Sequence, residues 1–136
     1  MTNALVSSTR NQLGNAHNSF QGAAHRVLCV CSAGLLRSPT AAKVLSEEYG
    51  YNTRACGASR EFALIPISEA LVHWAQEIVF VNGTNFWEIS EDQGFRKYAA
   101  GKDVVILDIP DMFEYCEEGL IREILHQYPE AKRITM

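Results

Sequence analysis

The sequence predicts an α/β domain whose parallel sheet carries helices on both faces. From residue 25 onward, short apolar runs alternate with longer segments of helical periodicity. The apolar runs are continuous, as expected of strands that are buried on both faces. A chain of 136 residues can form one compact domain and is too short for two of ordinary size. We therefore expect one domain over residues 25–136, preceded by a polar, flexible extension over residues 1–24 with at most a short helix over residues 4–13.

The first strand and the first helix have the clearest signals. Residues 27–30 form a short, partly β-branched apolar run. A helix is expected over residues 38–49, with Ser38 as its N-cap, Pro39 in its first turn and Gly50 as its stop. A strand, a short loop and a helix therefore follow one another in this order.

The remaining elements follow from the same patterns of apolar residues. The expected strands are residues 52–56, 78–81 and 104–107, and the expected helical regions are residues 68–74 with Ser68 as cap, residues 84–98 with a break at Gly94, and residues 117–128.

Charge and hydropathy exclude some classes of protein. The 12 Lys and Arg residues are scattered among 16 Asp and Glu residues, which argues against a nucleic-acid surface. No segment approaches the roughly 20 apolar residues of a membrane span, and residues 1–22 lack the apolar core of a signal peptide. We expect a cytoplasmic protein with reduced thiols, no nucleic-acid partner and no membrane partner.

The loop between the first strand and the first helix has the composition of an anion site. Cys31 and Arg37 stand six positions apart at its ends. A short loop that contains Gly34 can turn its N–H groups inward, and the helix that follows adds its positive end. The expected cradle consists of the backbone N–H groups of Ser32, Ala33, Gly34, Leu35, Leu36 and Arg37. The loop therefore predicts a site for inorganic phosphate or a similar oxyanion.

The residue types in this loop suit phosphoryl transfer. Cys31 is the expected nucleophile, because loop N–H groups, the helix end and Arg37 all stabilise a thiolate. The planar fork of Arg37 can hold two phosphoryl oxygens. Ser38 either donates to the sulfur or serves only as an N-cap. Asp108 and Asp111 follow the last expected strand, on the same sheet edge, and one of them is expected to protonate the leaving oxygen.

Residues 30–41, Val-Cys-Ser-Ala-Gly-Leu-Leu-Arg-Ser-Pro-Thr-Ala, resemble the signature of low-molecular-weight protein tyrosine phosphatases, including small bacterial predicted members. Weaker agreement at residues 56–59, 68–75 and 107–111 extends the resemblance over about residues 26–128. The resemblance implies a three-layer sandwich with a four-stranded parallel sheet in the order 2-1-3-4. It also implies hydrolysis of phosphotyrosine in proteins through a phosphocysteine intermediate, with no metal and no cofactor.

The sequence departs from the family at three points. Gly34 replaces an Asn that braces the loop, and Leu36 replaces a second loop cysteine. The family places its acid directly before a proline, whereas Ile109 separates Asp108 from the proline here and Asp111 follows it. We prefer Asp108 as the acid, with Asp111 as the alternative. Plain turn aspartates are the alternative to any catalytic role.

Aromatic and apolar side chains near the loop are candidates for a phosphotyrosine pocket. Leu35, Phe113 and Tyr115 are the expected walls, although such residues are equally common in cores.

Two other functions remain open. An arsenate reductase uses the same fold and loop and passes oxidation to further cysteines, for which Cys56 and Cys116 are candidates. A pseudophosphatase would bind phosphate without turnover. The spacing of the four cysteines argues against a structural zinc site, because it lacks the pairs that are typical of such sites.

Overall fold

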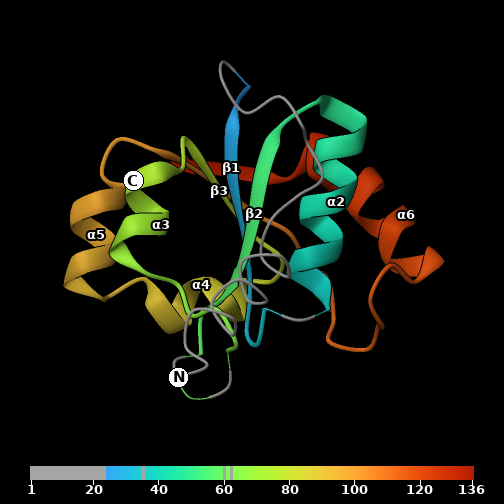
Figure 1. Ribbon diagram of the computed structural model, residues 1–136, viewed down its shortest axis with the longest axis horizontal. Helices are drawn as coiled ribbons and strands as arrows, with labels where there is room; N and C mark the ends of the chain where they lie inside the picture. The colour runs from blue at the N-terminus through green and yellow to red at the C-terminus, as the bar shows by residue number, and fades with distance from the viewer. Residues whose placement is uncertain (1–23, 35, 60, 62) are drawn as a thin grey trace, which may run out of the picture.

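The computed structural model describes residues 24–136 except residues 35, 60 and 62. The extension and the short helix expected before residue 24 therefore lie outside the described residues, as does Leu35. The elements, shown in Figure 1, are β1 (Arg26–Cys31), α2 (Arg37–Tyr49), β2 (Asn52–Gly57), α3 (Glu69–Trp74), β3 (Glu77–Phe80), α4 (Gly83–Ile89), α5 (Gln93–Ala99), β4 (Asp103–Ile106), α6 (Glu118–Gln127), a 3-10 turn (Tyr128–Glu130) and β5 (Lys132–Thr135).

The sheet has the order β2-β1-β3-β4-β5. The first four strands in this order are parallel to one another. Their order agrees with the predicted order 2-1-3-4. The prediction of four strands was incomplete, because β5 pairs antiparallel with β4, from Asp103 opposite Thr135 to Ile106 opposite Lys132. Three of the four residues of β5 are exposed, so it has no apolar run, and its structure depends on the neighbour with which it pairs.

Two apolar cores lie on opposite faces of the sheet. Figure 1 shows α2 and α6 on one side of the sheet, with α3 and α5 on the other. Successive residues of β1 alternate between the two cores: Val27, Cys29 and Cys31 belong to one, and Leu28 and Val30 to the other. All five are at most 3% exposed, which explains why a continuous apolar run indicated a central strand.

The first helix begins differently from the prediction. α2 starts at Arg37, its N-cap is Leu36, and no side chain caps it, so the assignment of Ser38 as N-cap was wrong. The hydroxyl of Ser38 is instead engaged by Cys31 and by the carbonyl oxygen of Cys56. The expected stop is confirmed: Gly50 takes a left-handed conformation with φ 72°.

The expected break within residues 84–98 lies at residues 90–92 rather than at Gly94. The side chain of Asp92 accepts the N–H of Phe95 and starts α5 there. Gly94 is inside α5, where a Cβ would come 2.6 Å from Oε1 of Glu69, so a glycine at this position permits close contact with α3. Ser68 caps α3 by accepting the N–H of Leu71, as predicted.

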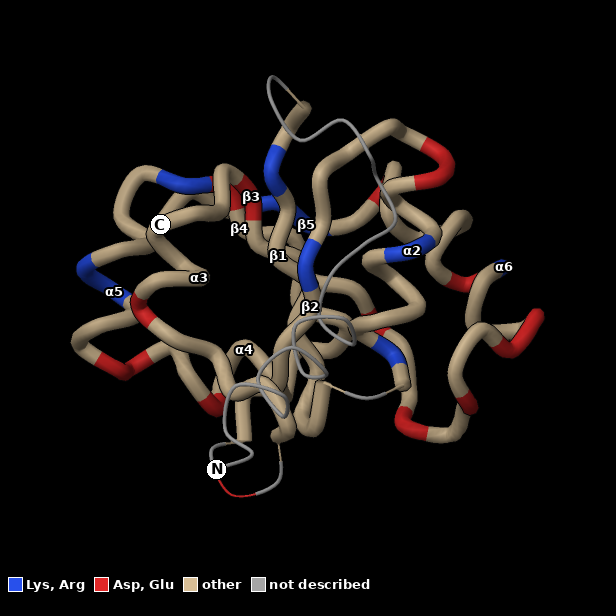
Figure 2. Tube along the Cα trace, in the orientation of Figure 1, with Lys and Arg blue, Asp and Glu red and all other residues tan. Residues whose placement is uncertain are grey.

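The surface charges are mixed. Figure 2 shows blue and red segments interspersed over the described elements. Among the described helices, none is both long enough and apolar enough to cross a membrane.

Candidate active site

The sulfur of Cys31 lies at the end of β1, where the chain turns into the loop. The N–H of Gly34 donates to it at 3.1 Å, and Oγ of Ser38 is 3.1 Å away. The same Ser38 oxygen is 3.1 Å from the carbonyl oxygen of Cys56, to which it can donate. A thiol can therefore donate to Ser38, whereas a thiolate can accept the Ser38 proton after the hydroxyl rotates. Two of the expected partners of the sulfur, a loop N–H group and the hydroxyl of Ser38, thus lie beside it.

Gly34 allows the loop to press against the end of β2. Its φ is +75°, and a Cβ there would lie 2.9 Å from two backbone atoms, the carbonyl carbon of Cys56 and the nitrogen of Gly57. Two backbone bonds fix the same contact, from the N–H of Ala58 to the carbonyl of Cys31 at 2.7 Å and from Ser59 to Ser32 at 3.0 Å. The loop is therefore braced by the backbone beyond β2, although it lacks the asparagine that the family signature has at this position.

Arg37 is 5% exposed, and its guanidinium uses its two edges differently. Nη1 donates to the carbonyl oxygen of Ile109 at 2.8 Å. Nε faces Oδ1 of Asp111 at 3.7 Å, and the Asp111 side chain is 75% exposed. One edge of the fork is thus anchored, while the Nε edge can hold an oxyanion.

The segment after β4 brings Asp111 to Arg37. Ile109 is fully buried, and its N–H donates to the carbonyl of Val81 at 3.0 Å, which continues the pairing of β3 with β4. The N–H of Met112 then donates to the carbonyl of Pro110 at 3.0 Å, so the chain turns tightly at Asp111. The geometry therefore places this carboxylate beside the guanidinium.

Asp108 faces another part of the surface. Its backbone is held by the side chain of Gln127, which accepts the Asp108 N–H at 2.7 Å and donates to the Asp108 carbonyl at 3.0 Å. It lines an open depression together with Asn82, Thr84, Trp87 and Lys132. The structure thus brings Asp111 to Arg37 and places Asp108 outside that ion pair.

Two asparagines of the α4 region contact the site although nothing in the sequence reasoning selected them. The amide nitrogen of Asn82 donates to the carbonyl oxygen of Ile109 at 3.2 Å. The amide nitrogen of Asn85, which is fully buried, donates to Oγ of Ser32 at 2.9 Å. A polar residue inside an otherwise apolar helix face was the available signal.

The expected pocket residues have different environments. Phe113 is half-buried and packs against the core between α2 and α6. Tyr115 is 46% exposed. A hydrogen bond with Cys116 and partial burial raise the pKa of Tyr115. Tyr115 therefore remains accessible, whereas Phe113 is mainly a packing residue.

All four cysteines are free, and they differ in accessibility. Cys56 belongs to the core on the opposite face of the sheet from Cys31, so its side chain points away from the nucleophile. Burial raises the pKa of both the Cys29 and the Cys56 thiols. Cys116 is half-buried, and its N–H donates to Oγ1 of Thr40 at 2.8 Å. Within the described ranges, no cluster of three or more His, Cys, Asp and Glu residues could hold a metal ion.

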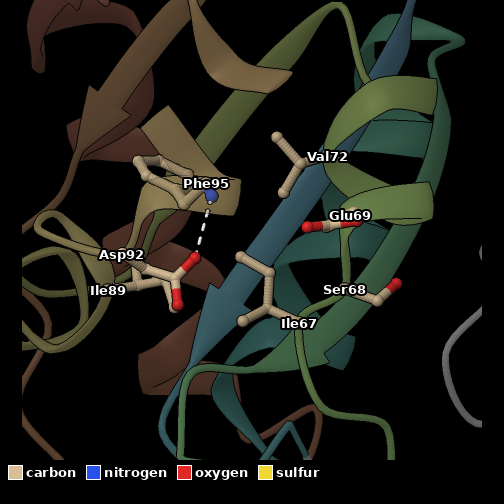
Figure 3. Close-up of a pocket in the computed structure, with 7 residues that line it drawn as sticks. All are labelled: Ile67, Ser68, Glu69, Val72, Ile89, Asp92 and Phe95. Carbon is tan, nitrogen blue, oxygen red and sulfur yellow. Dashed lines mark hydrogen bonds between the residues drawn. The ribbon is translucent and has the colours of Figure 1, made fainter. Parts of the chain in front are cut away.

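A separate cavity of about 90 Å³ lies between α3 and the α4–α5 segment (Figure 3). Its walls are the side chains of Ile67, Ser68, Glu69, Val72, Ile89, Asp92 and Phe95. Asp92 is engaged as the cap of α5, as the dashed line to Phe95 shows. The cavity is on the face of the sheet opposite the sulfur of Cys31, so it is separate from the candidate active site.

Comparison of the chain with protein-family models, with curated proteins and with solved structures gives no match.

Proposed function

We propose that the protein is a cysteine-dependent phosphomonoesterase that acts on phosphotyrosine in proteins. The observation that carries the proposal is the presence of three groups at one edge of the sheet, on the segments that follow β1 and β4. These groups are the sulfur of Cys31 with its Gly34 and Ser38 partners, the Nε edge of Arg37, and the carboxylate of Asp111.

In the first step, the Cys31 thiolate attacks phosphorus and the bond from phosphorus to the leaving oxygen breaks. Arg37 and the loop N–H groups hold the phosphoryl oxygens as their charge redistributes. Protonated Asp111 gives its proton to the leaving oxygen, since a phenoxide leaves poorly without one. The products of this step are a neutral phenol and a phosphocysteine.

In the second step, water attacks the phosphocysteine. The Asp111 carboxylate takes a proton from the water, and the sulfur–phosphorus bond breaks to release inorganic phosphate and the thiolate. The hydroxyl of Ser38 can donate a hydrogen bond to the departing thiolate, since the oxygen is 3.1 Å from the sulfur. No metal or cofactor takes part in this scheme.

We take Asp111 as the proton donor in preference to Asp108, which sequence reasoning favoured. The Asp111 carboxylate is 3.7 Å from Arg37, whereas the contacts of Asp108 hold its backbone to Gln127. Displacement of Asp111 from Arg37 by a phosphate would leave the carboxylate at the edge of the occupied site.

A phenolic substrate fits the apolar side chains at this edge. Leu36, Met112 and Tyr115 are large, exposed and carried by the two loops that form the site. They would contact the ring of a phosphotyrosine, and the family resemblance of residues 30–41 agrees with such a substrate. Four free thiols agree with a reducing compartment such as the cytoplasm.

Hydrolysis of an aryl phosphate by the purified protein tests the proposal. We expect turnover that falls at least about 10³-fold in Cys31→Ser, and trapping of phosphate on Cys31 in wild type after acid quench. Equal rates for wild type and Cys31→Ser would refute the proposed enzymatic function. Phosphate binding without turnover in wild type would instead indicate a pseudophosphatase.

The acid is identified by comparing Asp111→Asn with Asp108→Asn. The true donor should lose about 10²-fold in kcat/KM on phenyl phosphate and much less on a nitrophenyl ester, whose leaving group needs no proton. If Asp108→Asn shows this dependence and Asp111→Asn does not, the assignment to Asp111 is wrong.

A further inference from the structure

Two asparagines in the α4 region contact the two loops of the candidate site. Asn82 is the N-cap of α4, and Asn85 is three positions further along, about one helical turn. Asn82 contacts Ile109 in the segment that carries Asp111, and Asn85 contacts Ser32, which directly follows Cys31. A single short helix therefore contacts both the nucleophile loop and the proposed acid segment.

Asn82 uses both ends of its side chain. Its Oδ1 accepts the N–H of Thr84 at 3.0 Å and caps the helix. Its Nδ2 donates to the carbonyl oxygen of Ile109, the same oxygen that accepts from Nη1 of Arg37. Asn82, the guanidinium and the acid segment are thus joined at one atom, two residues before Asp111.

Asn85 is fully buried, and its amide nitrogen is shared. It lies 2.9 Å from Oγ of Ser32 and 3.3 Å from Oε1 of Glu88, to which Ser32 also donates at 3.1 Å. Among the described residues, its Oδ1 has no hydrogen-bond partner. An unpaired buried acceptor is costly, so its presence calls for an explanation other than stability.

We propose that Asn82 and Asn85 are positioning residues that set the separation between the acid and the nucleophile. The inference rests on the proposed function. The acid must reach a leaving oxygen on a phosphorus held by Cys31, and a misplacement of about 1 Å can cost about 10²-fold in rate. Asn82 fixes the acid segment, whereas Asn85 fixes the start of the phosphate loop.

The two residues have different kinetic signatures. Asn82→Ser retains a capping oxygen but has no amide nitrogen to reach Ile109. We expect kcat/KM to fall about 10-fold on phenyl phosphate and to change less than about 2-fold on a nitrophenyl ester. Asn82→Thr also keeps a capping oxygen and lacks the amide nitrogen, so we expect the same result for it.

Asn85→Ala removes the bond to Ser32 and loosens the phosphate cradle. We expect about 5-fold to 10-fold weaker inhibition by inorganic phosphate, with equal losses in kcat/KM on both esters. Ser68→Ala is the matched control, because it removes the cap of α3 without touching either loop. It should lower the melting temperature and leave both kinetic measures unchanged.

The failures of the two proposals are distinguishable. If the wild-type protein hydrolyses neither ester, the proposed function fails, and this inference fails with it. If wild type is active but Asn82→Ser and Asn82→Thr lose the same factor on both esters, the positioning role of Asn82 alone is overturned. If inhibition by inorganic phosphate is unchanged in Asn85→Ala, the positioning role of Asn85 is overturned.

Discussion

The two ends of the sheet each bury a charged side chain, and the two side chains differ in how fully their polar atoms are paired. At the carboxyl ends of the parallel strands, Arg37 is 5% exposed, and at the opposite end Glu77 is 4% exposed. Buried charges are costly unless they are paired, so each position needs an explanation.

The carboxylate of Glu77 has partners at both oxygens. Oε1 is 3.0 Å from Nε2 of His25 and 3.5 Å from Nη1 of Arg133, and Oε2 accepts the hydroxyl of Tyr128 at 2.6 Å. Burial and the bond to Glu77 raise the pKa of Tyr128. At this end of the sheet, a paired polar network joins β3 to β5 and to His25, the residue before β1.

Among the described residues, the guanidinium of Arg37 is only partly engaged. Its Nη1 edge is anchored on Ile109, while its Nε edge faces a largely exposed carboxylate at 3.7 Å. The comparison teaches that burial of a charge does not by itself mark a functional site. What distinguishes the candidate site is an edge of the buried group that faces only an exposed carboxylate, which an anionic ligand could displace.

The largest expected effect is a loss of activity when Arg37, at the carboxyl ends of the strands, is replaced. Arg37→Lys should lower kcat/KM by about 10²-fold to 10³-fold, because a point charge cannot replace the fork. The loss of stability should be limited to that of the buried bond to the carbonyl oxygen of Ile109, since the pair with Asp111 is solvated. Steady-state kinetics and thermal unfolding check both halves, and a variant that keeps a tenth of wild-type activity contradicts the proposed role.

At the same end of the sheet, a side chain at position 34 should destabilise the protein. Gly34→Ala should cost about 3 kcal/mol in the free energy of unfolding, from a positive φ and a backbone clash. Gly101→Ala is the control, because Gly101 has φ +79° but no atom within 4 Å of its added Cβ. Denaturant unfolding should show a loss of only about 1 kcal/mol there, and equal losses would mean that the close approach to β2 is unimportant.

The opposite end should respond in stability alone. Glu77→Ala should cost about 2 kcal/mol, because the hydroxyl of Tyr128 loses its 2.6 Å acceptor and keeps only a longer contact of 3.3 Å with the hydroxyl of Tyr51. Glu77→Gln, which still offers an oxygen to that hydroxyl, should lose less. Values of kcat/KM should stay within about 2-fold of wild type below the melting transition, and a selective loss of activity would show that this end is coupled to the site.

The smallest expected effect is that two of the cysteines are not alkylated in the folded protein. Because burial raises the pKa of Cys29 and Cys56, both stay protonated at neutral pH and should resist iodoacetamide until the protein unfolds. Cys31 should be alkylated, and inorganic phosphate should protect it without protecting Cys116. Peptide mass spectrometry measures all four positions, and native labelling of Cys56 as fast as Cys31 would reopen the cysteine relay of an arsenate reductase.

Local signals predicted the parts of the fold that are close in sequence. Gly50 and Ser68 end or begin helices through bonds to residues four or fewer positions away, and β1 was visible as an apolar run. β5 was missed because it forms a strand only by pairing with β4, which lies about thirty residues earlier in the chain.

The candidate site was predictable to the same extent. Cys31, Gly34 and Arg37 lie on one continuous segment, so their spacing was informative. The choice between Asp108 and Asp111 depends on the burial of Ile109 and on the turn after it. The contact of Asn85 with Ser32 spans 53 positions, a distance at which sequence patterns carry no pairing information.

β5 also bears on how this protein behaves at high concentration. The strand is four residues long and forms the edge of the sheet, where unpaired backbone groups invite pairing with another molecule. Two consecutive exposed cations, Lys132 and Arg133, stand on that edge. Two copies that approached edge to edge would bring these like charges together, which disfavours pairing of the sheets through this strand.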